Sequence, residues 1–208
     1  MTLAWFVGSA ILRAQSSTVL YSSGFQDGDL SFWTLDGPVG ATMVIDDAVG
    51  QPPGSMRIDA PSVSQNANAR TPCFPFADST AEFWQLSADV FRPTDPETGW
   101  ECSLIFRLYS GEECDGNLLF EWSTTGGNSG QWNSRTVELF MLGLDPSPRS
   151  LLADLSVGPP EFGGGTCFFD NVELHGPGEH IPALGPGSFA GLVLLLAVTG
   201  MWILYRQR

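Results

Sequence analysis

Residues 82–91 read EFWQLSADVF and carry the clearest indication of the fold class. Every second side chain in it is apolar, and the positions between them are mostly polar. Successive side chains of a β-strand point to opposite faces of the sheet, so alternation with period two is typical of a strand with one buried face. The sequence therefore predicts a strand whose core-facing side chains are Trp84, Leu86, Ala88 and Val90.

The same alternation recurs between residues 18 and 174, without a useful apolar stripe of helical period. Turn-forming clusters rich in Gly, Pro or Asp separate the apolar stretches. Many short strands joined by such turns are typical of a sandwich, so we expect an all-β, jelly-roll β-sandwich over 17–175. The other expected core-facing sets are Cys102, Leu104, Phe106 and Leu108; Leu118, Phe120 and Trp122; Val137, Leu139 and Met141; Ala153, Leu155 and Val157; and Phe168, Val172 and Leu174.

The charge balance excludes two classes of protein. The 208 residues include 23 Asp or Glu and 9 Arg, with no Lys, which gives a formal net charge of −14. A nucleic-acid-binding surface needs a surplus of basic side chains, which this chain lacks. An aromatic content of 12% is too high for a disordered acidic chain.

An apolar run near the start indicates export. Residues 3–12 (LAWFVGSAIL) precede small residues around Ser16, a pattern typical of a secretory signal peptide over 1–16. No Lys or Arg precedes the run, and an upstream start codon would supply one. The alternative is a buried first strand.

A second apolar run lies near the end of the sequence. Residues 189–205 (FAGLVLLLAVTGMWILY) carry no charge, and a helix of this length spans roughly 26 Å, near the lower limit for a bilayer core. Arginines beside an apolar run are typical of its cytoplasmic side. We therefore expect a single-pass transmembrane helix over 188–205 and a cytoplasmic tail, 206–208. Six arginines and all 23 acids then belong to the exported part of the chain, which carries a net charge of −17.

A Gly/Pro-rich linker, 176–187, precedes the second apolar run and contains Ile181, Pro182, Ala183 and Leu184. This motif, followed by an apolar run and a basic tail, resembles the bacterial C-terminal sorting signals of the IPTL-CTERM and PEP-CTERM kind. Ala183 stands where the IPTL form has Thr. The resemblance implies recognition by a membrane-embedded sorting peptidase, with the bacterial inner membrane as an intermediate or final site before the cell surface or matrix.

Three landmarks inside the domain form a second resemblance. They are 24–33 (GFQDGDLSFW), 54–58 (GSMRI) and 169–174 (FDNVEL), and their order and spacing are similar to those of galactose-binding-like jelly rolls, which include many carbohydrate-binding modules. The resemblance implies a structural calcium ion, held by the closing Asp170 and by the N-terminal loop. The loop ligands would be Gly24, Gln26 and Asp27, with Gln26 in place of the usual Glu.

Asp170 is informative by itself as well. Period two places it on the core face with Phe168, Val172 and Leu174. A buried carboxylate is costly unless it is paired or bound to a metal ion. The alternative to calcium is a carboxylate that caps backbone N–H groups at the edge of a strand.

Four cysteines fit an exported protein with two disulfides, for which three pairings are possible. Cys102 and Cys114 flank one strand and its turn, so a local bridge between them is the expected pairing. Cys73 would then pair with Cys167. No pair has the short spacing of a zinc site.

Trp100 and Trp132 border predicted turns, which makes them candidate platforms for stacking on a sugar ring. The alternative is a structural role, because large aromatic side chains dominate sandwich cores. Trp33, Trp84 and Trp122 are expected in the core.

Catalysis is not expected. The two histidines, His175 and His180, lie where the domain ends and in the linker, and adjacent acids such as Glu112 and Glu113 or Asp46 and Asp47 are usually solvated surface. We expect an exported, non-catalytic surface or matrix protein that contacts polysaccharide. The alternatives are a purely structural envelope protein without a sugar ligand and, third, a secreted hydrolase on the same fold.

Overall fold

The computed structural model describes residues 17–61, 65–76, 83–93, 100–125, 129–141, 144–158 and 165–177. All regular elements within them are β-strands. The predicted signal peptide, the sorting motif 181–184, the transmembrane helix 188–205 and the basic tail lie outside the described residues. Within the described part of the chain, no helix has the length and hydropathy to cross a membrane.

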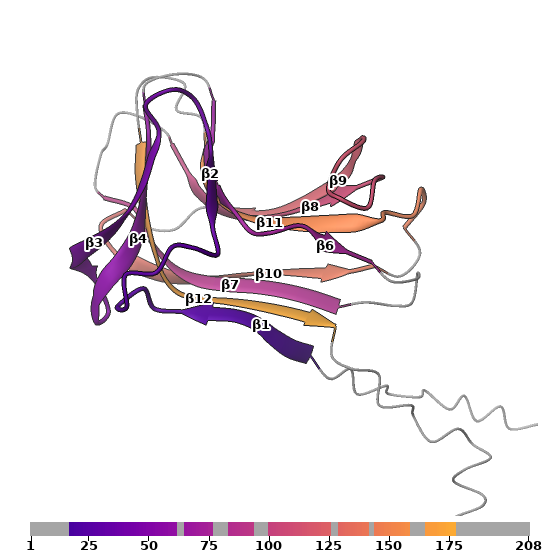
Figure 1. The fold of residues 1–208 in the computed structure, drawn as a ribbon. Helices are drawn as coiled ribbons and strands as arrows, with labels where there is room; N and C mark the ends of the chain where they lie inside the picture. The colour runs from indigo at the N-terminus through magenta and orange to yellow at the C-terminus, as the bar shows by residue number, and fades with distance from the viewer. Residues whose placement is uncertain are drawn as a thin grey trace, which may run out of the picture. The chain divides into compact units, whose positions relative to one another are not determined.

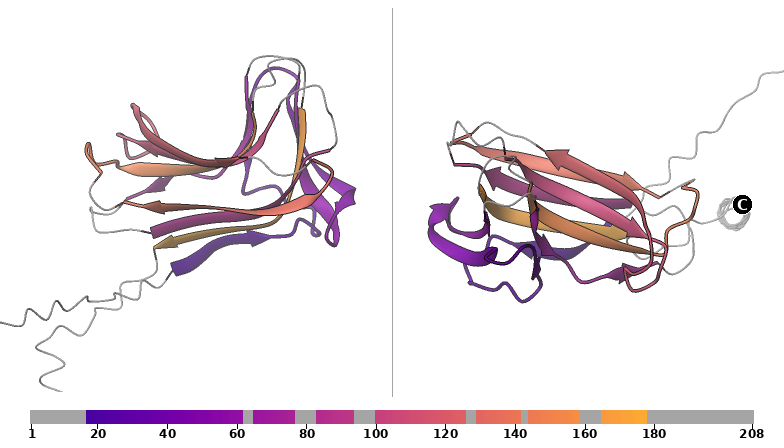
Figure 2. Two further views of the ribbon diagram at one scale, coloured as in Figure 1. Left: turned by 180° about the vertical axis from the view of Figure 1, so that it is seen from behind. Right: turned by 90° about the horizontal axis from the view of Figure 1, so that it is seen from above.

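Two six-stranded antiparallel sheets stack as layers (Figures 1 and 2). This architecture confirms the predicted β-sandwich. The first sheet has the order β10 (Trp132–Phe140), β7 (Phe83–Phe91), β12 (Gly165–Pro177), β4 (Pro53–Ala60) and β3 (Thr42–Gly50), with β1 (Ser17–Ser23) also pairing with β12. The second sheet has the order β2 (Thr34–Asp36), β5 (Ala67–Arg70), β11 (Ser150–Val157), β8 (Cys102–Tyr109) and β9 (Leu118–Thr125), with β6 (Phe74–Pro75) also pairing with β11.

The core lies between the two sheets and follows the predicted alternation. In β7 the burial pattern alternates strictly, with the even-numbered positions Trp84 to Val90 buried. The expected core positions of β8 and β11 are also buried, as are Val137 and Leu139 of β10. Exclusion of this apolar surface from water supplies the main driving force for the fold.

The predicted apolar face of β9 is correct for two of its three residues. Phe120 and Trp122 pack against the core, whereas Leu118 is 49% exposed. The register between β8 and β9 shifts at Tyr109, which pairs with Leu118 although Leu108 pairs with Phe120. A one-residue bulge reverses the faces of the side chains on either side of it, which is why period two fails here.

A second bulge corrects the prediction for the closing strand. Phe169 and Leu174 of β12 pair with core residues of β7, so Phe168 and Asp170 point to the opposite face. The register shifts between Asp170 and Glu173, and Asn171 adopts a left-handed φ of 47°. Asp170 is buried, as expected, but on the outer side of the first sheet rather than in the core.

The predicted disulfide pairing is wrong. The bridges are Cys73–Cys114 and Cys102–Cys167. Cys102 begins β8, whereas Cys114 follows its far end, and an eight-residue strand is roughly 25 Å long. That separation exceeds the reach of a disulfide, so the local bridge cannot form.

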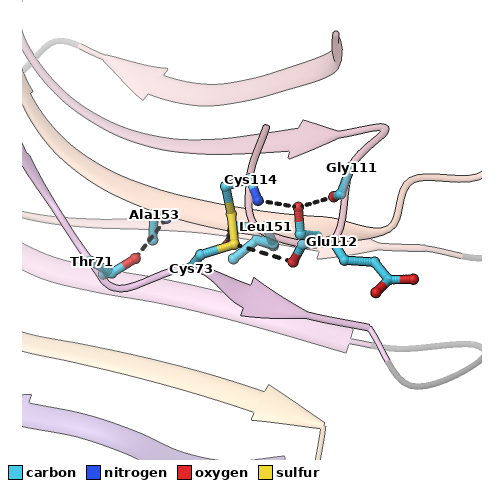
Figure 3. Close-up of a disulfide and its surroundings, with 8 residues drawn as sticks. Thr71, Cys73, Gly111, Glu112, Cys114, Leu151 and Ala153 are labelled. Atoms are coloured by element: carbon cyan, nitrogen blue, oxygen red, sulfur yellow. Dashed lines mark hydrogen bonds between the residues drawn. A yellow bond between two sulfur atoms is a disulfide. The ribbon is translucent and has the colours of Figure 1, made fainter. Parts of the chain in front are cut away.

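Contacts with β11 position the two cysteines of the first bridge, Cys73 and Cys114. The Cys114 N–H donates to Ser150 Oγ at the start of β11, and Cys73 precedes β6, which also pairs with β11 (Figure 3). Cys102 and Cys167 are buried core-facing residues of the second and first sheets, so their bridge joins the two layers.

Candidate functional site

The side of the second sheet that faces away from the core collects polar side chains. They occupy the positions between the core residues of each strand, because strand side chains alternate. Several are as buried as core residues, with exposed fractions of 0% for Asp154 and Ser156 and 4% for Asn68. We call this surface the polar face. It comprises Asp36, Asn68, Arg70, Ser103, Ile105, Arg107, Tyr109, Glu121, Ser150, Leu152, Asp154 and Ser156.

Charged residues of alternating sign cross the polar face, one from each strand in the order β2, β5, β11, β8 and β9. Arg70 Nη2 lies 2.9 Å from Asp36 Oδ2, and Arg70 Nε lies 3.4 Å from Asp154 Oδ1. Arg107 contacts Asp154 Oδ2 through Nη1, and its Nε donates to Glu121 Oε2 over 2.9 Å. We call these five residues the charged row.

Strand register builds the charged row. Arg70 is the direct partner of Asp154 between β5 and β11, and Arg107 is the direct partner of Glu121 between β8 and β9. Side chains directly opposite each other in an antiparallel pair have Cβ atoms roughly 5 Å apart, within reach for an ion pair. The row is most exposed at its two ends, where the Asp36 and Glu121 side chains are 51% and 44% exposed.

Asp154 is the buried centre of the row. Burial raises its pKa to about 6, although the guanidinium groups of Arg107 and Arg70 act in the opposite direction. The pKa of Arg107 is raised overall. Burial by itself would lower this pKa, but the Asp154 and Glu121 carboxylates raise it by more. The buried Asp154 carboxylate contacts one arginine on each side and thereby positions both guanidinium groups.

Buried oxygen atoms next to the charged row lack hydrogen-bond partners among the described residues. They are Asn68 Oδ1 and Ser156 Oγ. Asn68 and Ser156 are direct partners between β5 and β11. The core pair Ala69 and Leu155 separates them from Arg70 and Asp154. Because an unmet buried polar atom costs free energy, a buried water molecule bound to these oxygens would stabilise the sheet.

Tyr109 brings an aromatic ring to the polar face. It lies two residues after Arg107 on β8 and is half-buried. Burial raises the pKa of its hydroxyl, so the group stays protonated and can donate a hydrogen bond. Sequence reasoning missed Tyr109 and the charged row, although the alternation in 104–109 (LIFRLY) places Arg107 and Tyr109 on the side of the strand opposite to the core residues.

The two predicted platform residues lie apart. Trp100 is only 4% exposed and belongs to the core cluster. The Arg92 guanidinium carbon lies 5.8 Å from its ring centroid, and a Cβ added to Gly165 would approach Trp100 Cδ2 to 2.8 Å. A ring enclosed in this way has no free face for a sugar, so the structural alternative applies to Trp100.

Trp132 is half-buried on the outer side of the first sheet, the opposite layer from the polar face. Its ring centroid lies 5.4 Å from that of Phe91, which in turn lies 5.8 Å from that of Phe168. Trp132 therefore stays a candidate platform, but it does not belong to the polar face.

Asp170 caps backbone donors, as its alternative interpretation proposed. Its Oδ2 accepts from Gln51 N–H and its Oδ1 from Asn171 N–H, both over 2.8 Å. Gln51 lies in the turn between β3 and β4. Gln26 lies beside this hairpin, because a Cβ added to Gly54 would come within 3.3 Å of Gln26 Cα.

The calcium site implied by the resemblance stays a prediction. The Asp27 carboxylate accepts from Asp29 N–H within its own loop, next to Gly24 and Gln26. In the part of the chain that the structure describes, no three His, Cys, Asp or Glu side chains gather as a metal site would require. Calcium also accepts backbone and amide oxygens such as those of Gly24 and Gln26, so the ion is tested by its removal.

One acid of each pair considered for hydrolysis forms an ion pair with an arginine. Glu112 forms an exposed ion pair with Arg149 at 3.1 Å, and Asp46 lies 3.7 Å from Arg57. His175 contacts Glu173 at 3.2 Å, while His180 lies outside the described residues. None of these pairs belongs to the polar face.

No protein-family model and no curated protein matches the chain. Solved structures do match it. A structure of carbohydrate-binding modules from the β-sandwich superfamily is 14% identical with a TM-score of 0.52, and the match covers 77% of this chain and 63% of that one. A xylan-binding domain from Paenibacillus barcinonensis is 12% identical with a TM-score of 0.54, over 79% and 98% of the two chains.

A third match is the family 11 carbohydrate-binding module of a cellulosomal cellulase from Clostridium thermocellum. It is 14% identical with a TM-score of 0.50, over 81% of this chain and 99% of that one. At such low identities the matches show the fold. The described domain has the jelly-roll fold of carbohydrate-binding modules.

Proposed function

We propose that the domain is a non-catalytic module that binds a neutral polysaccharide on its polar face. The observation that carries the proposal is the charged row, in which the side chains of Asp36, Arg70 and Glu121 are 51%, 30% and 44% exposed and can reach a ligand. The fold shared with carbohydrate-binding modules supports it.

The donors and acceptors of the polar face suit sugar hydroxyls. A hydroxyl both donates and accepts, so neighbouring hydroxyls can donate to Glu121 or Asp36 and accept from an arginine. Charge-assisted hydrogen bonds of this kind are stronger than neutral ones. The Tyr109 ring supplies an apolar surface for the C–H side of a pyranose.

Charge argues for a neutral ligand. The charged row holds three acids and two arginines, and the exported part of the chain carries −17. A field of this sign lowers the local concentration of anionic chains. Uncharged plant-type or bacterial glycans are therefore the expected class.

A glycan array probed with the full-length protein in mild detergent tests the proposal. Glu121→Gln removes the charge of a half-exposed acid in the row, and Glu138→Gln removes an exposed acid from the first sheet as a matched control. We expect neutral glycans to bind the unaltered chain and the control, and to bind Glu121→Gln at least tenfold more weakly. Absence of binding to every glycan would favour the purely structural alternative, and release of shortened sugars would favour the hydrolase.

We also propose that the chain is exported and held at the membrane, or sorted from it, through its C-terminal signal. The signal-like run 3–12, the IPAL motif with the run 189–205, and two disulfides in the domain support this proposal. Cell fractionation followed by C-terminal mass spectrometry tests it. A mature protein that retains Arg208 would contradict cleavage by a sorting peptidase, and a cytoplasmic protein with reduced cysteines would contradict export.

A further inference from the structure

The outer side of the first sheet carries a row of aromatic side chains in strand register. Trp132 of β10 is the direct partner of Phe91 of β7, and Phe91 is the direct partner of Phe168 of β12. The rings are in contact, with centroid separations of 5.4 and 5.8 Å. We call these three residues the aromatic row. Phe168 is 7% exposed and supports the other two rings, which are half-buried.

Hydrogen-bonding groups lie alongside on the same strands, two residues away in β10 and β7 and three residues away in β12. The Asp89 carboxylate accepts from Asn171 Nδ2 over 2.9 Å and from Ser134 Oγ. Ser134 and Asp89 are direct partners between β10 and β7, just as Trp132 and Phe91 are. The aromatic row is therefore bordered by an oriented carboxylate, an amide and a hydroxyl.

We propose that the aromatic row is a second glycan-binding surface, distinct from the polar face. An aromatic ring offers its face to the C–H side of a sugar, and Asp89, Asn171 and Ser134 offer hydrogen bonds to the hydroxyls at its edge.

The charge of this surface favours a neutral glycan over the other possible occupants. Asp46, Asp59 and Asp89 lie on the same side of the sheet, and Arg57 already pairs with the first two at 3.7 and 3.0 Å. A surface with this surplus of acids repels anionic lipid headgroups and nucleic acids. Neutral hydroxyl-bearing chains are not repelled.

Two binding surfaces on opposite layers would allow one molecule to bridge two polysaccharide chains. This consequence rests on the proposed function, since it requires that the polar face also binds a glycan. Bridging would give the chain a role in cross-linking a matrix, and linked sites can bind more tightly together than either does alone.

Titration of the full-length protein in detergent with neutral oligosaccharides tests the inference. The probes are xylo-, cello- and manno-oligosaccharides, and the readout is the NMR signal of the Trp132 indole N–H, assigned by its loss in Trp132→Phe. We expect the signal of the unaltered chain to shift on titration. Because the Trp132 variants lack this signal, their affinity is measured by calorimetric titration in the Glu121→Gln background, where Trp132→Ala should weaken binding at least tenfold and Trp132→Phe should largely retain it. Phe140→Ala, which removes a 60% exposed ring at the other end of β10, is the matched control and should bind normally.

The outcomes for the two surfaces are separable. If Glu121→Gln abolishes all binding and the Trp132 signal never moves, the second surface is overturned while the proposed function stands. If Trp132→Ala abolishes all binding and Glu121→Gln has no effect, the aromatic row binds glycan and the polar face does not. If none of the probes shifts any signal, both proposals are overturned for neutral glycans.

Discussion

The two outer surfaces of the sandwich use the same architectural device with opposite chemistry. Both carry a row of side chains in register across neighbouring strands, but the row on the second sheet is ionic and the row on the first is aromatic. Asp154, at the centre of the charged row, is fully buried, whereas Trp132 of the aromatic row is half-buried. The alternation with period two thus determines the core that the two sheets share, while the outward-facing positions of each sheet can carry side chains of a different kind.

The largest expected loss of stability comes from removing the disulfide that joins the two sheets. The Cys102–Cys167 bridge joins the layers through the core, and its loop of 65 residues predicts a loss of roughly 4 kcal/mol when both cysteines become Ala. Denaturant unfolding of the full chain measures the loss. The Cys73→Ala, Cys114→Ala double variant is the control, and we expect a smaller effect from it because these cysteines are half-buried. A loss below 1 kcal/mol for the core bridge would show that packing alone couples the sheets.

The pH dependence of stability tests the ionic surface. Burial raises the pKa of Asp154 from 3.8 to about 6, so the folded chain holds a proton that the unfolded chain releases between these pH values. The free energy of unfolding should therefore fall as the pH rises from 4 to 6, by up to about 3 kcal/mol from this group. Asp154→Asn should remove this pH dependence.

The same variant separates stability from binding. Asp154→Asn leaves Arg70 and Arg107 without the central carboxylate that positions them, so we expect glycan affinity at pH 7 to fall at least tenfold while the fold persists. Unchanged affinity would show that the arginines need no central anion. A variant that unfolds at pH 7 would show instead that the ionised carboxylate stabilises the protein.

The exposed ends of the charged row should matter for binding more than for stability. Asp36→Asn breaks a contact with Arg70 at a half-exposed side chain, and exposed ion pairs contribute roughly 0–1 kcal/mol. Thermal unfolding should therefore shift by no more than a few degrees. Glycan binding measured on the same sample should weaken several-fold, and equal binding would place the ligand away from β2.

Removal of divalent cations has the smallest expected effect. Since Asp170 is already held by the N–H groups of Gln51 and Asn171, EDTA should change the melting temperature by less than about 2 °C. A larger drop that added calcium reverses would establish the calcium ion that the jelly-roll resemblance implies.

Much of the fold could be predicted from the sequence, because each strand of the core carries its own alternation. Bulges mark the limit of this reasoning. Asn171 takes the left-handed conformation that Asn tolerates better than most residues, and this reverses the faces of β12 beyond Asp170. The disulfide pairing failed for a related reason, since proximity along the chain is a poor guide when a straight strand separates two cysteines.

The candidate site could be predicted only in part. Trp132 was accessible to sequence reasoning because an aromatic residue next to a turn is visible in a single segment. The charged row was not, because Arg70, Asp154 and Arg107 become neighbours only through the strand order β5–β11–β8. Long-range pairing between strands sets that order, and no local pattern encodes it.

The NMR signals of the arginine side-chain Nε–H groups provide the most direct test of the central claim, that the polar face binds a neutral glycan. The chain has only nine basic side chains, all of them arginines, so the spectrum is simple. On titration with a neutral oligosaccharide we expect the Arg70 and Arg107 signals to shift, with the exposed Arg149 signal unchanged as a reference. Saturable binding that leaves the Arg70 and Arg107 signals in place would contradict it.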